Sequence, residues 1–409
     1  MNTGIRSLLH PGRNGATVGY FAAYITLGMS SAILGPTLPG LAGQTSVSLS
    51  QISLLFPAHS LGYLLGSFLS GRLYDRVLGH PLMAAALCLL AILLAGVPLA
   101  PVLWLLFLAV LIAGMAGGAV DVGGNTLIVW AYGSSVGPYM NALHFFFGVG
   151  ALLAPILVAQ AFALTDRFAG AYWVLALVAL PISLWISRMP SPSQDTRHNP
   201  LPGETASASG ARHAVDGRVL VLLVAVLLGL YIGAEAAFGG WIYTYALALN
   251  LADATTAAYL TSIFWGALTA GRFLSIPIAL RFRPRTILLV DLVGCVVSLL
   301  ALLLGSGSWM VTWLGAAGVG LFMASIFPTA ISWTGQRVPI TGQITGAFLV
   351  AASVGGMSLP WIIGQLFEPV GPQVAILAIL AALIGATVVF GVLVYYSERK
   401  LAAIPSKLG

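Results

Sequence analysis

Twelve long apolar segments constrain the fold of this chain more than any other feature. A helix needs about 20 mostly apolar residues to cross the hydrocarbon core of a bilayer. The segments of this kind lie at residues 15–42, 49–71, 80–99, 101–130, 137–163, 168–187, 218–248, 254–280, 285–304, 309–333, 342–366 and 371–396. Charged residues make up only 7% of the 409 residues, whereas soluble domains have about 25%. The sequence therefore predicts an all-α membrane protein with twelve transmembrane helices.

The longest polar stretch separates these segments into two sets of six. Residues 188–217 are rich in Ser, Pro, Gly and charged residues, a composition typical of a flexible linker. We therefore expect an N-terminal six-helix bundle at residues 1–187 and a cytoplasmic linker at 188–217. A C-terminal six-helix bundle with a short cytoplasmic tail would then occupy residues 218–409.

Lysine and arginine residues collect on one side of the predicted membrane. The connections on that side include Arg72, Arg76 and Arg337, whereas those on the other side contain only Arg167. Because cytoplasmic loops are enriched in positive charge, we expect cytoplasmic N- and C-termini and a multi-pass protein of the plasma (inner) membrane. The net charge of +6 does not indicate a nucleic-acid partner, since the basic residues are scattered singly.

The two halves contain an internal repeat. Residues 66–76 read GSFLSGRLYDR and residues 271–281 read GRFLSIPIALR. Gly150, Pro155 and Gln160 likewise align with residues 355, 360 and 365, which are again Gly, Pro and Gln. Internal repeats are typical of secondary transporters, in which the binding site lies near the bilayer midplane between the repeats. The repeat predicts two pseudo-symmetric bundles.

Asp121 is an acid inside an apolar segment that has no basic residue. A charge at the bilayer centre costs about 3 kcal/mol or more, so such residues usually handle ions or substrates. Asn125 follows one helical turn later and shares the same face. Four glycines (117, 118, 123 and 124) flank the pair, and we expect them to leave open space beside the acid. The alternative is a buried packing acid that is hydrogen-bonded to Asn125.

The next segment begins with Asn141 and His144, which also share one helical face. His144 has the chemistry to donate to substrate hydroxyls or to relay a proton, and a structural histidine is the alternative. In the first segment, Tyr24 lies on a face that we expect to reach the same cavity. We therefore count these three residues, with Asn125, among the predicted substrate-binding residues.

Glu235 is the second predicted intramembrane acid with a functional role. Tyr231 and Tyr243 lie one and two turns away on nearly the same face. Carboxylates, amides and aromatic rings together are the side chains expected to bind a sugar. We add Tyr243, Trp241 and Trp265 to the predicted substrate site, although Trp241 fits a membrane-interface position equally well.

Arg272 lies within the eighth segment and Asp291 lies near the start of the ninth. We expect an ion pair between these two side chains, in a gating or packing role. The two cysteines, Cys88 and Cys295, match no metal-binding spacing. The sequence predicts no resident metal and no cofactor, although a sodium ion near Asp121 is compatible with its oxygen atoms.

The loop after the second segment reads GRLYDRVLGH at residues 71–80, and with twelve spans in two halves it resembles the major facilitator superfamily. Gly71, Asp75 and Arg76 match the cytoplasmic motif of that superfamily, whereas Tyr74 and His80 depart from it. The resemblance implies a gating role for the three matching residues. A solvated loop with a helix-capping acid is the simpler reading. The superfamily mostly works as monomers, which implies a monomer here.

A narrower resemblance covers nearly the whole chain. The segments LGMSSAILGPTLPGLA (27–42), QISLLFPAHSLGYLLGS (51–67), DVGGN (121–125), ALHFFFGVGALLAP (142–155) and YIGAEAAFGGWIYTYAL (231–247) are similar to the sodium-dependent glucose transporter-like branch, which is related to the fucose:proton symporters. This resemblance implies symport of a monosaccharide with sodium or a proton, and it places Asp121 at the acidic position of that family. Glu235 would be the second cation-coupling residue.

Three other functional classes are alternatives for a protein of this kind: an exporter, an intramembrane enzyme and an ATP-driven pump. A proton-coupled exporter of drugs or small metabolites would need a more apolar cavity than the polar residues above suggest. An intramembrane enzyme would need a protease motif such as HExxH, and an ATP-driven pump would need a Gly-x4-Gly-Lys-Ser/Thr loop. Neither motif occurs in the sequence, so we expect a transporter and not an enzyme.

Overall fold

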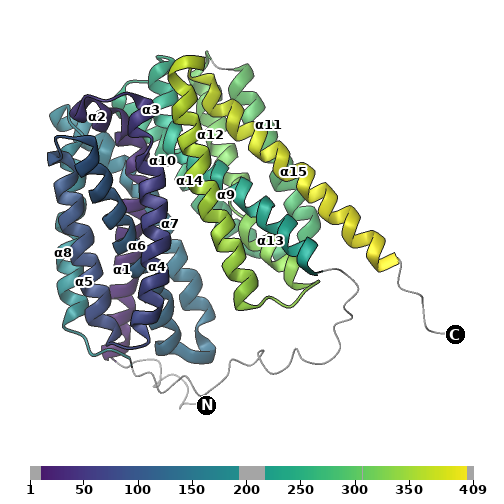
Figure 1. Ribbon diagram of the computed structural model, residues 1–409, viewed down its shortest axis with the longest axis horizontal. Coiled ribbons are helices and arrows are strands. Elements are labelled where there is room, and N and C mark those ends of the chain that lie inside the picture. Colours follow the sequence, from purple (N-terminus) through teal and green to yellow (C-terminus); the bar gives the residue numbers. More distant parts are fainter. Residues whose placement is uncertain (1–10, 193–216, 306, 403–409) are drawn as a thin grey trace. The chain divides into compact units, whose positions relative to one another are not determined.

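A computed structural model describes residues 11–192, 217–305 and 307–402 (Figure 1). Most of the predicted linker, residues 193–216, lies outside the described residues. The described elements are the helices α1 (Pro11–Ala32), α2 (Leu34–Thr45), α3 (Leu49–Ile52), α4 (Leu55–Tyr74), α5 (Gly79–Gly96), η2 (Val97–Leu99), α6 (Leu103–Tyr132), η3 (Gly133–Ser135), α7 (Gly137–Thr165), α8 (Ala169–Ser187), α9 (Gly217–Ala248), α10 (Ala254–Arg281), α11 (Pro284–Leu304), α12 (Trp309–Met323), α13 (Ile326–Gly335), α14 (Gly342–Val370) and α15 (Gln373–Ala402). The described part of the chain contains no strand, so the all-α prediction is confirmed.

The described residues form eleven helical segments long and apolar enough to cross a membrane, and α1 with α2 forms a twelfth. These two helices meet at an angle of 50°. Pro36 lies just after the bend, and a proline has no N–H to donate to the carbonyl four residues earlier. The twelve predicted spans are therefore confirmed, and the first of them is broken beside Gly35 and Pro36.

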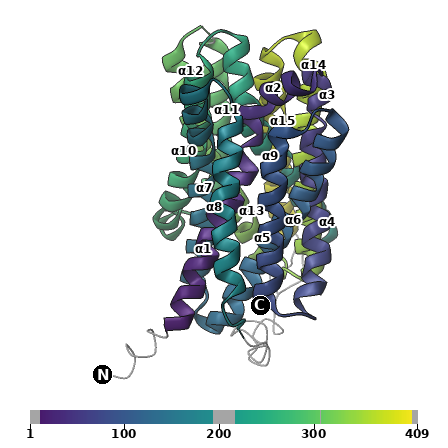
Figure 2. The same ribbon diagram turned by 90° about the vertical axis from the view of Figure 1, so that its left-hand side faces the viewer.

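The chain divides into two compact units. The first unit is Met1–Pro202 with Ala254–Ser262, and the second is Gly203–Asp253 with Ile263–Gly409. In the first unit, α1 packs against α7, α4 packs against α6, and α5 packs against α8, which runs beside it in Figure 1 and Figure 2. In the second unit, α9 packs against α14 and α15, and α11 packs against α12.

Glycines determine how closely the helices of the first unit approach. A Cβ atom added to Gly28 of α1 would lie 2.0 Å from the carbonyl oxygen of Phe147 in α7. One added to Gly150 of α7 would lie 2.0 Å from the carbonyl oxygen of Ile25. The two backbones therefore touch at these positions, a contact that only small residues permit in membrane helices.

The second unit repeats this contact between α9 and α14. A Cβ atom at Gly355 would lie 1.9 Å from the carbonyl oxygen of Gly229, and one at Gly233 would lie 3.0 Å from the carbonyl oxygen of Gly355. Gly233 and Gly355 stand at the same separation in the chain from Gly28 and Gly150, respectively. The pseudo-symmetry predicted from the repeat therefore corresponds to the same glycine-mediated packing in both units.

Candidate functional site

The carboxylate of Asp121 in α6 is the acceptor at the centre of a hydrogen-bond cluster in the first unit. The Tyr24 hydroxyl of α1 donates to Asp121 Oδ1 at 2.7 Å, and the Tyr63 hydroxyl of α4 donates to Oδ2 at 2.7 Å. Asn125 Nδ2 donates to Oδ1 at 3.1 Å and to the Tyr24 hydroxyl oxygen at 2.8 Å. The cluster therefore joins three helices through one carboxylate.

The glycines of α6 bring these aromatic side chains close to the acid. A Cβ atom at Gly124 would lie 2.1 Å from Tyr24 Cε2, and one at Gly123 would lie 2.1 Å from the Tyr74 hydroxyl. The expectation of open space beside the acid is therefore wrong at these two positions. The missing side chains make room for tyrosine rings, because an aromatic ring can lie directly on the backbone only where no Cβ projects.

The charge of Asp121 has no cationic partner among the described residues, since neither ion pair present there involves it. Hydrogen bonds donated to a carboxylate stabilise its ionised form, and Tyr24, Tyr63 and Asn125 all donate. The cluster can therefore hold a negative charge inside a membrane-spanning segment. A proton or a small cation would neutralise that charge.

The structure places His144 beside this cluster. Its ring lies edge-on to Tyr24, with ring centroids 5.9 Å apart and planes at 79°. His144 and Asn141 are both exposed on α7. Of the two residues, His144 therefore lies beside the Asp121 cluster, whereas Asn141 makes no hydrogen bond to that cluster among the bonds of the described residues.

Glu235 in α9 lies in a separate cluster within the second unit. Arg272 Nη2 of α10 lies 3.7 Å from Glu235 Oε1, with the Glu235 side chain 12% exposed. The predicted ion pair of Arg272 with Asp291 is therefore wrong. Asp291 instead accepts a hydrogen bond from Ser325. The face of α10 that carries Arg272 meets α9, which chain position alone does not reveal.

Tyr231 connects Glu235 to the break between α12 and α13. Its hydroxyl lies within hydrogen-bond distance of Glu235 Oε2 and, at 3.0 Å, of the carbonyl oxygen of Met323. A phenol has only one proton to donate. Glu235 Oε2 and the Met323 carbonyl oxygen therefore compete for that proton.

The three aromatic residues predicted for the substrate site have different environments in the second unit. Trp241 is 0% exposed, donates from Nε1 to the carbonyl oxygen of Pro360 at 2.9 Å, and stacks on Phe367. Tyr243 is buried as well. Trp265 is half-buried, and its ring fills the space above Gly239, where a Cβ atom would lie 2.7 Å from Cζ2. Its buried Nε1 has no hydrogen-bond partner among the described residues.

The residues predicted to act in gating lie where α4 ends. Gly71 is in the last turn, Asp75 is the C-terminal cap residue, and both Asp75 and Arg76 are exposed. His80, which departs from the family motif, is fully buried. Its Nε2 lies 2.5 Å from the Tyr20 hydroxyl, so its role here is to join α5 to α1.

Tyr63 is a member of the Asp121 cluster that sequence reasoning did not include. The sequence signal for its position is two pairs of glycines, each pair four residues apart. One pair is in α4 (Gly62 and Gly66) and the other is in α6 (Gly114 and Gly118). A Cβ atom at Gly118 would lie 2.3 Å from the carbonyl oxygen of Tyr63. Such glycine pairs indicate close helix packing in membranes, and this packing brings Tyr63 onto Asp121.

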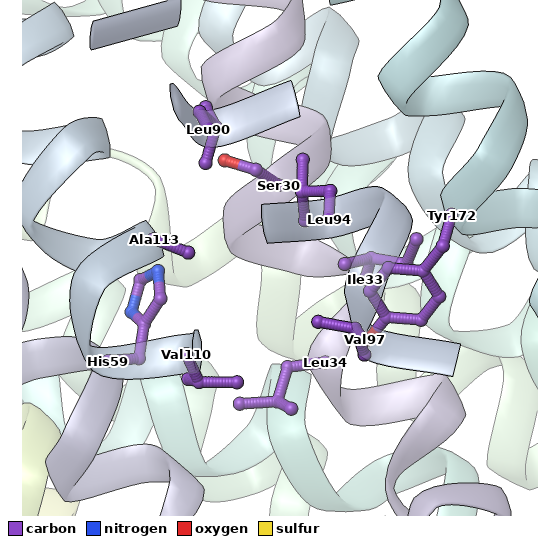
Figure 3. A pocket seen from close by; sticks show the side chains of 10 residues that line it. All are labelled: Ser30, Ile33, Leu34, His59, Leu90, Leu94, Val97, Val110, Ala113 and Tyr172. Atoms are coloured by element: carbon purple, nitrogen blue, oxygen red, sulfur yellow. The ribbon is translucent and has the colours of Figure 1, made fainter. Parts of the chain in front are cut away.

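A small pocket also lies within the first unit (Figure 3). His59, Ser30 and Tyr172 are its polar lining residues, and aliphatic side chains such as Leu90 and Val110 form most of the remainder. It has room for about one water molecule. The pocket is therefore too small to hold a sugar, and it contains none of the predicted substrate-binding residues.

Comparisons with known proteins agree with this architecture. The family model described as "Major Facilitator Superfamily" matches residues 20–360. Sodium-dependent glucose transporter 1A of Mus musculus is 30% identical over 95% of this chain and 97% of its own length. The human sodium-dependent glucose transporter 1 is 30% identical over 94% of this chain and 79% of its own length. Human major facilitator superfamily domain-containing protein 4A is 28% identical over 87% of each.

Two solved structures are similar in fold. A bacterial homolog of the human lysosomal transporter Spinster, in an inward-facing and unoccupied conformation, has a TM-score of 0.68 at 13% identity and covers 96% of this chain and 97% of its own. The nucleoside transporter NupG has a TM-score of 0.71 at 14% identity and covers 93% of this chain and 99% of its own.

Proposed function

This chain belongs to the Major Facilitator Superfamily and is a multi-pass membrane transporter, not an enzyme, and we propose that it moves a hexose together with a cation that binds at Asp121. Two of the relatives are named as sodium-dependent glucose transporters. Alternating access, in which the two halves rock around a fixed site, would provide the transport cycle. The protein would act as a monomer in the plasma (inner) membrane with both termini in the cytoplasm.

The Asp121 cluster is the observation that carries this proposal. It holds an acid with three hydrogen-bond donors and no cationic partner within a membrane span of the described chain. Such an acid is costly to keep in a membrane and is typically retained for ion or substrate handling. A cation that binds there during the cycle would offset the charge.

The substrate would be recognised by polar and aromatic side chains. In the first unit, Asn141 and His144 are exposed and carry groups that bond sugar hydroxyls. In the second unit, the half-buried Trp265 has an indole N–H without a partner among the described residues. Trp241 is left out of the proposed substrate site because its side chain is fully buried and its N–H is already used.

The proposal is tested by uptake of radiolabelled glucose into proteoliposomes under a sodium gradient or a proton gradient, imposed separately. Accumulation driven by one of the two gradients supports symport and identifies the cation. If neither gradient drives accumulation of glucose or of other hexoses, the proposal is wrong. Efflux of an apolar drug under the proton gradient alone would instead support the exporter alternative.

Replacing Tyr63 with Phe should tighten cation binding at Asp121 without affecting the fold, because the cation-free carboxylate loses a hydrogen bond that stabilises its charge. The substitution removes a hydroxyl that donates to Asp121 at 2.7 Å, and a hydrogen bond to a charged group contributes about 1.5–3 kcal/mol. We therefore expect the cation concentration for half-maximal uptake to fall by about one order of magnitude or more.

Tyr74→Phe is the matched control for this prediction. The Tyr74 hydroxyl donates to the carbonyl oxygen of Ala119 in the same helix as Asp121, at 3.1 Å, and not to the carboxylate. Its loss should leave the cation dependence unchanged. Equal effects of the two variants would show that Tyr63 acts only through packing.

Replacing Glu235 with Gln should weaken substrate affinity and leave the cation dependence of uptake in place. The amide keeps a hydrogen-bond acceptor for Tyr231 but loses the charge that faces Arg272. The Michaelis constant for the sugar should therefore rise in an uptake assay. An unchanged Michaelis constant would assign Glu235 to a structural role.

A further inference from the structure

A third acid, Asp291, is buried in a membrane span of the second unit and has no role in the function proposed above. It lies on α11 and is 8% exposed. The hydrogen bond described for its side chain comes from the Ser325 hydroxyl to Oδ2. Asp291 is therefore less exposed and less well provided with donors than Asp121, whose carboxylate accepts from three side chains.

Ser325 lies at the break in the tenth span. It falls between the end of α12 at Met323 and the start of α13 at Ile326. Pro328 follows in the first turn of α13, so it has no N–H to offer the carbonyl oxygen of Ala324 four residues earlier. Pro328 therefore removes one helical hydrogen bond at the break. The Ser325 hydroxyl, which lies in the break, donates to Asp291.

No cation balances a charge on Asp291 within the described chain. Arg272 pairs with Glu235, and Arg285 at the start of α11 pairs with Glu398 of α15. The sequences of α12 and α13 contain no acidic, basic, Tyr or Cys residue. The thiol of Cys295, one turn along α11, interacts electrostatically with Asp291 and with Tyr231.

We propose that Asp291 and Ser325 form a proton-binding site in the second unit, separate from the cation site at Asp121. An ionised carboxylate without a counter-charge is strongly disfavoured in the membrane interior. A bound proton removes that charge, and the neutral carboxyl still accepts a hydrogen bond from Ser325. Loss of the proton leaves a charge directly against the break in the tenth span, so the stability of the packing at that break should depend on pH.

The test is the thermal unfolding temperature of the purified full-length protein, measured from mildly acidic to alkaline pH in the absence of sugar and of any ion gradient. The wild-type unfolding temperature should fall as rising pH removes the proton, because the ionised acid is stable in water but not in this site. Asp291→Asn keeps the acceptor for Ser325 and is always neutral, so this fall should be lost.

Three further variants make the result specific. Glu368→Gln removes an exposed carboxylate of the same unit and should retain the fall. Ser325→Ala removes the donor that stabilises the ionised form, so the midpoint of the fall should move to higher pH. Asp121→Asn should retain the fall, which separates this proposal from the proposed transport function.

An unchanged fall over the pH range in which the wild type loses the proton would overturn the proposal when it is measured in Asp291→Asn. If that variant does not fold, an unmoved midpoint in Ser325→Ala would overturn it instead. A stabilisation by sodium at constant pH that disappears in either variant would also overturn it, because the ligand would then be a metal cation and not a proton.

Discussion

Asp121→Asn should abolish the accumulation of hexose against its gradient while the protein remains folded. The amide has the size of the carboxylate and keeps one oxygen that can accept from Tyr24 or from Tyr63, but it has no charge to attract a cation. Binding of the cation, and with it the driving force for uphill transport, should therefore be lost. Uptake into proteoliposomes should then stop at equal concentrations inside and outside.

Asp166→Asn is the matched control, because Asp166 is an exposed acid of the same unit. It has a φ angle of 54°, a conformation that Asn also tolerates. This variant should accumulate substrate as the wild type does. If Asp121→Asn still concentrates the sugar under a sodium or proton gradient, Asp121 is not the coupling site.

The second large effect is expected at Gly150, where even an added methyl group would collide with backbone. The Cβ atom of Gly150→Ala would lie 2.0 Å from the carbonyl oxygen of Ile25, so α1 and α7 must move apart. Overpacking of this kind costs typically about 1–3 kcal/mol, and more where the backbone must shift. The thermal unfolding temperature in detergent and the yield of folded protein should both fall markedly.

Gly137→Ala in the same helix provides the control. A Cβ atom there has nothing within 4 Å, and alanine is the stronger helix former by about 1 kcal/mol. This variant should be as stable as the wild type or slightly more stable. Equal stability of the two variants would show that the α1–α7 contact tolerates separation and does not fix the first unit.

The spans were predictable because burial in a bilayer is a property of composition along the chain. Each of the twelve predicted segments corresponds to one helical span, and three of these spans consist of two consecutive α-helices, namely α1 with α2, α3 with α4, and α12 with α13. The repeat was predictable because the same packing requires the same residue types in both units. Gly28 with Gly150 in the first unit, and Gly233 with Gly355 in the second, let two helices approach closely.

The composition of the Asp121 cluster was only partly predictable. Asp121 and Asn125 lie one turn apart, so their proximity follows from helix geometry alone. Tyr63 lies in α4 and Asp121 lies in α6, with the whole of α5 between them in the chain. Their contact depends on the crossing and rotation of α4 against α6. The glycine pairs of these helices indicated close packing, but not which side chain the packing would bring to the acid.

The partners of Arg272 and Trp241 were settled only by three-dimensional packing. Arg272 faces Glu235 on α9 and not Asp291, and Trp241 is buried against Phe367 instead of lying open to a substrate. Hydropathy averages over a whole helix and is nearly the same all round a membrane span. It therefore carries no information about the direction in which a given side chain points, and that direction is decided by how neighbouring helices fit together.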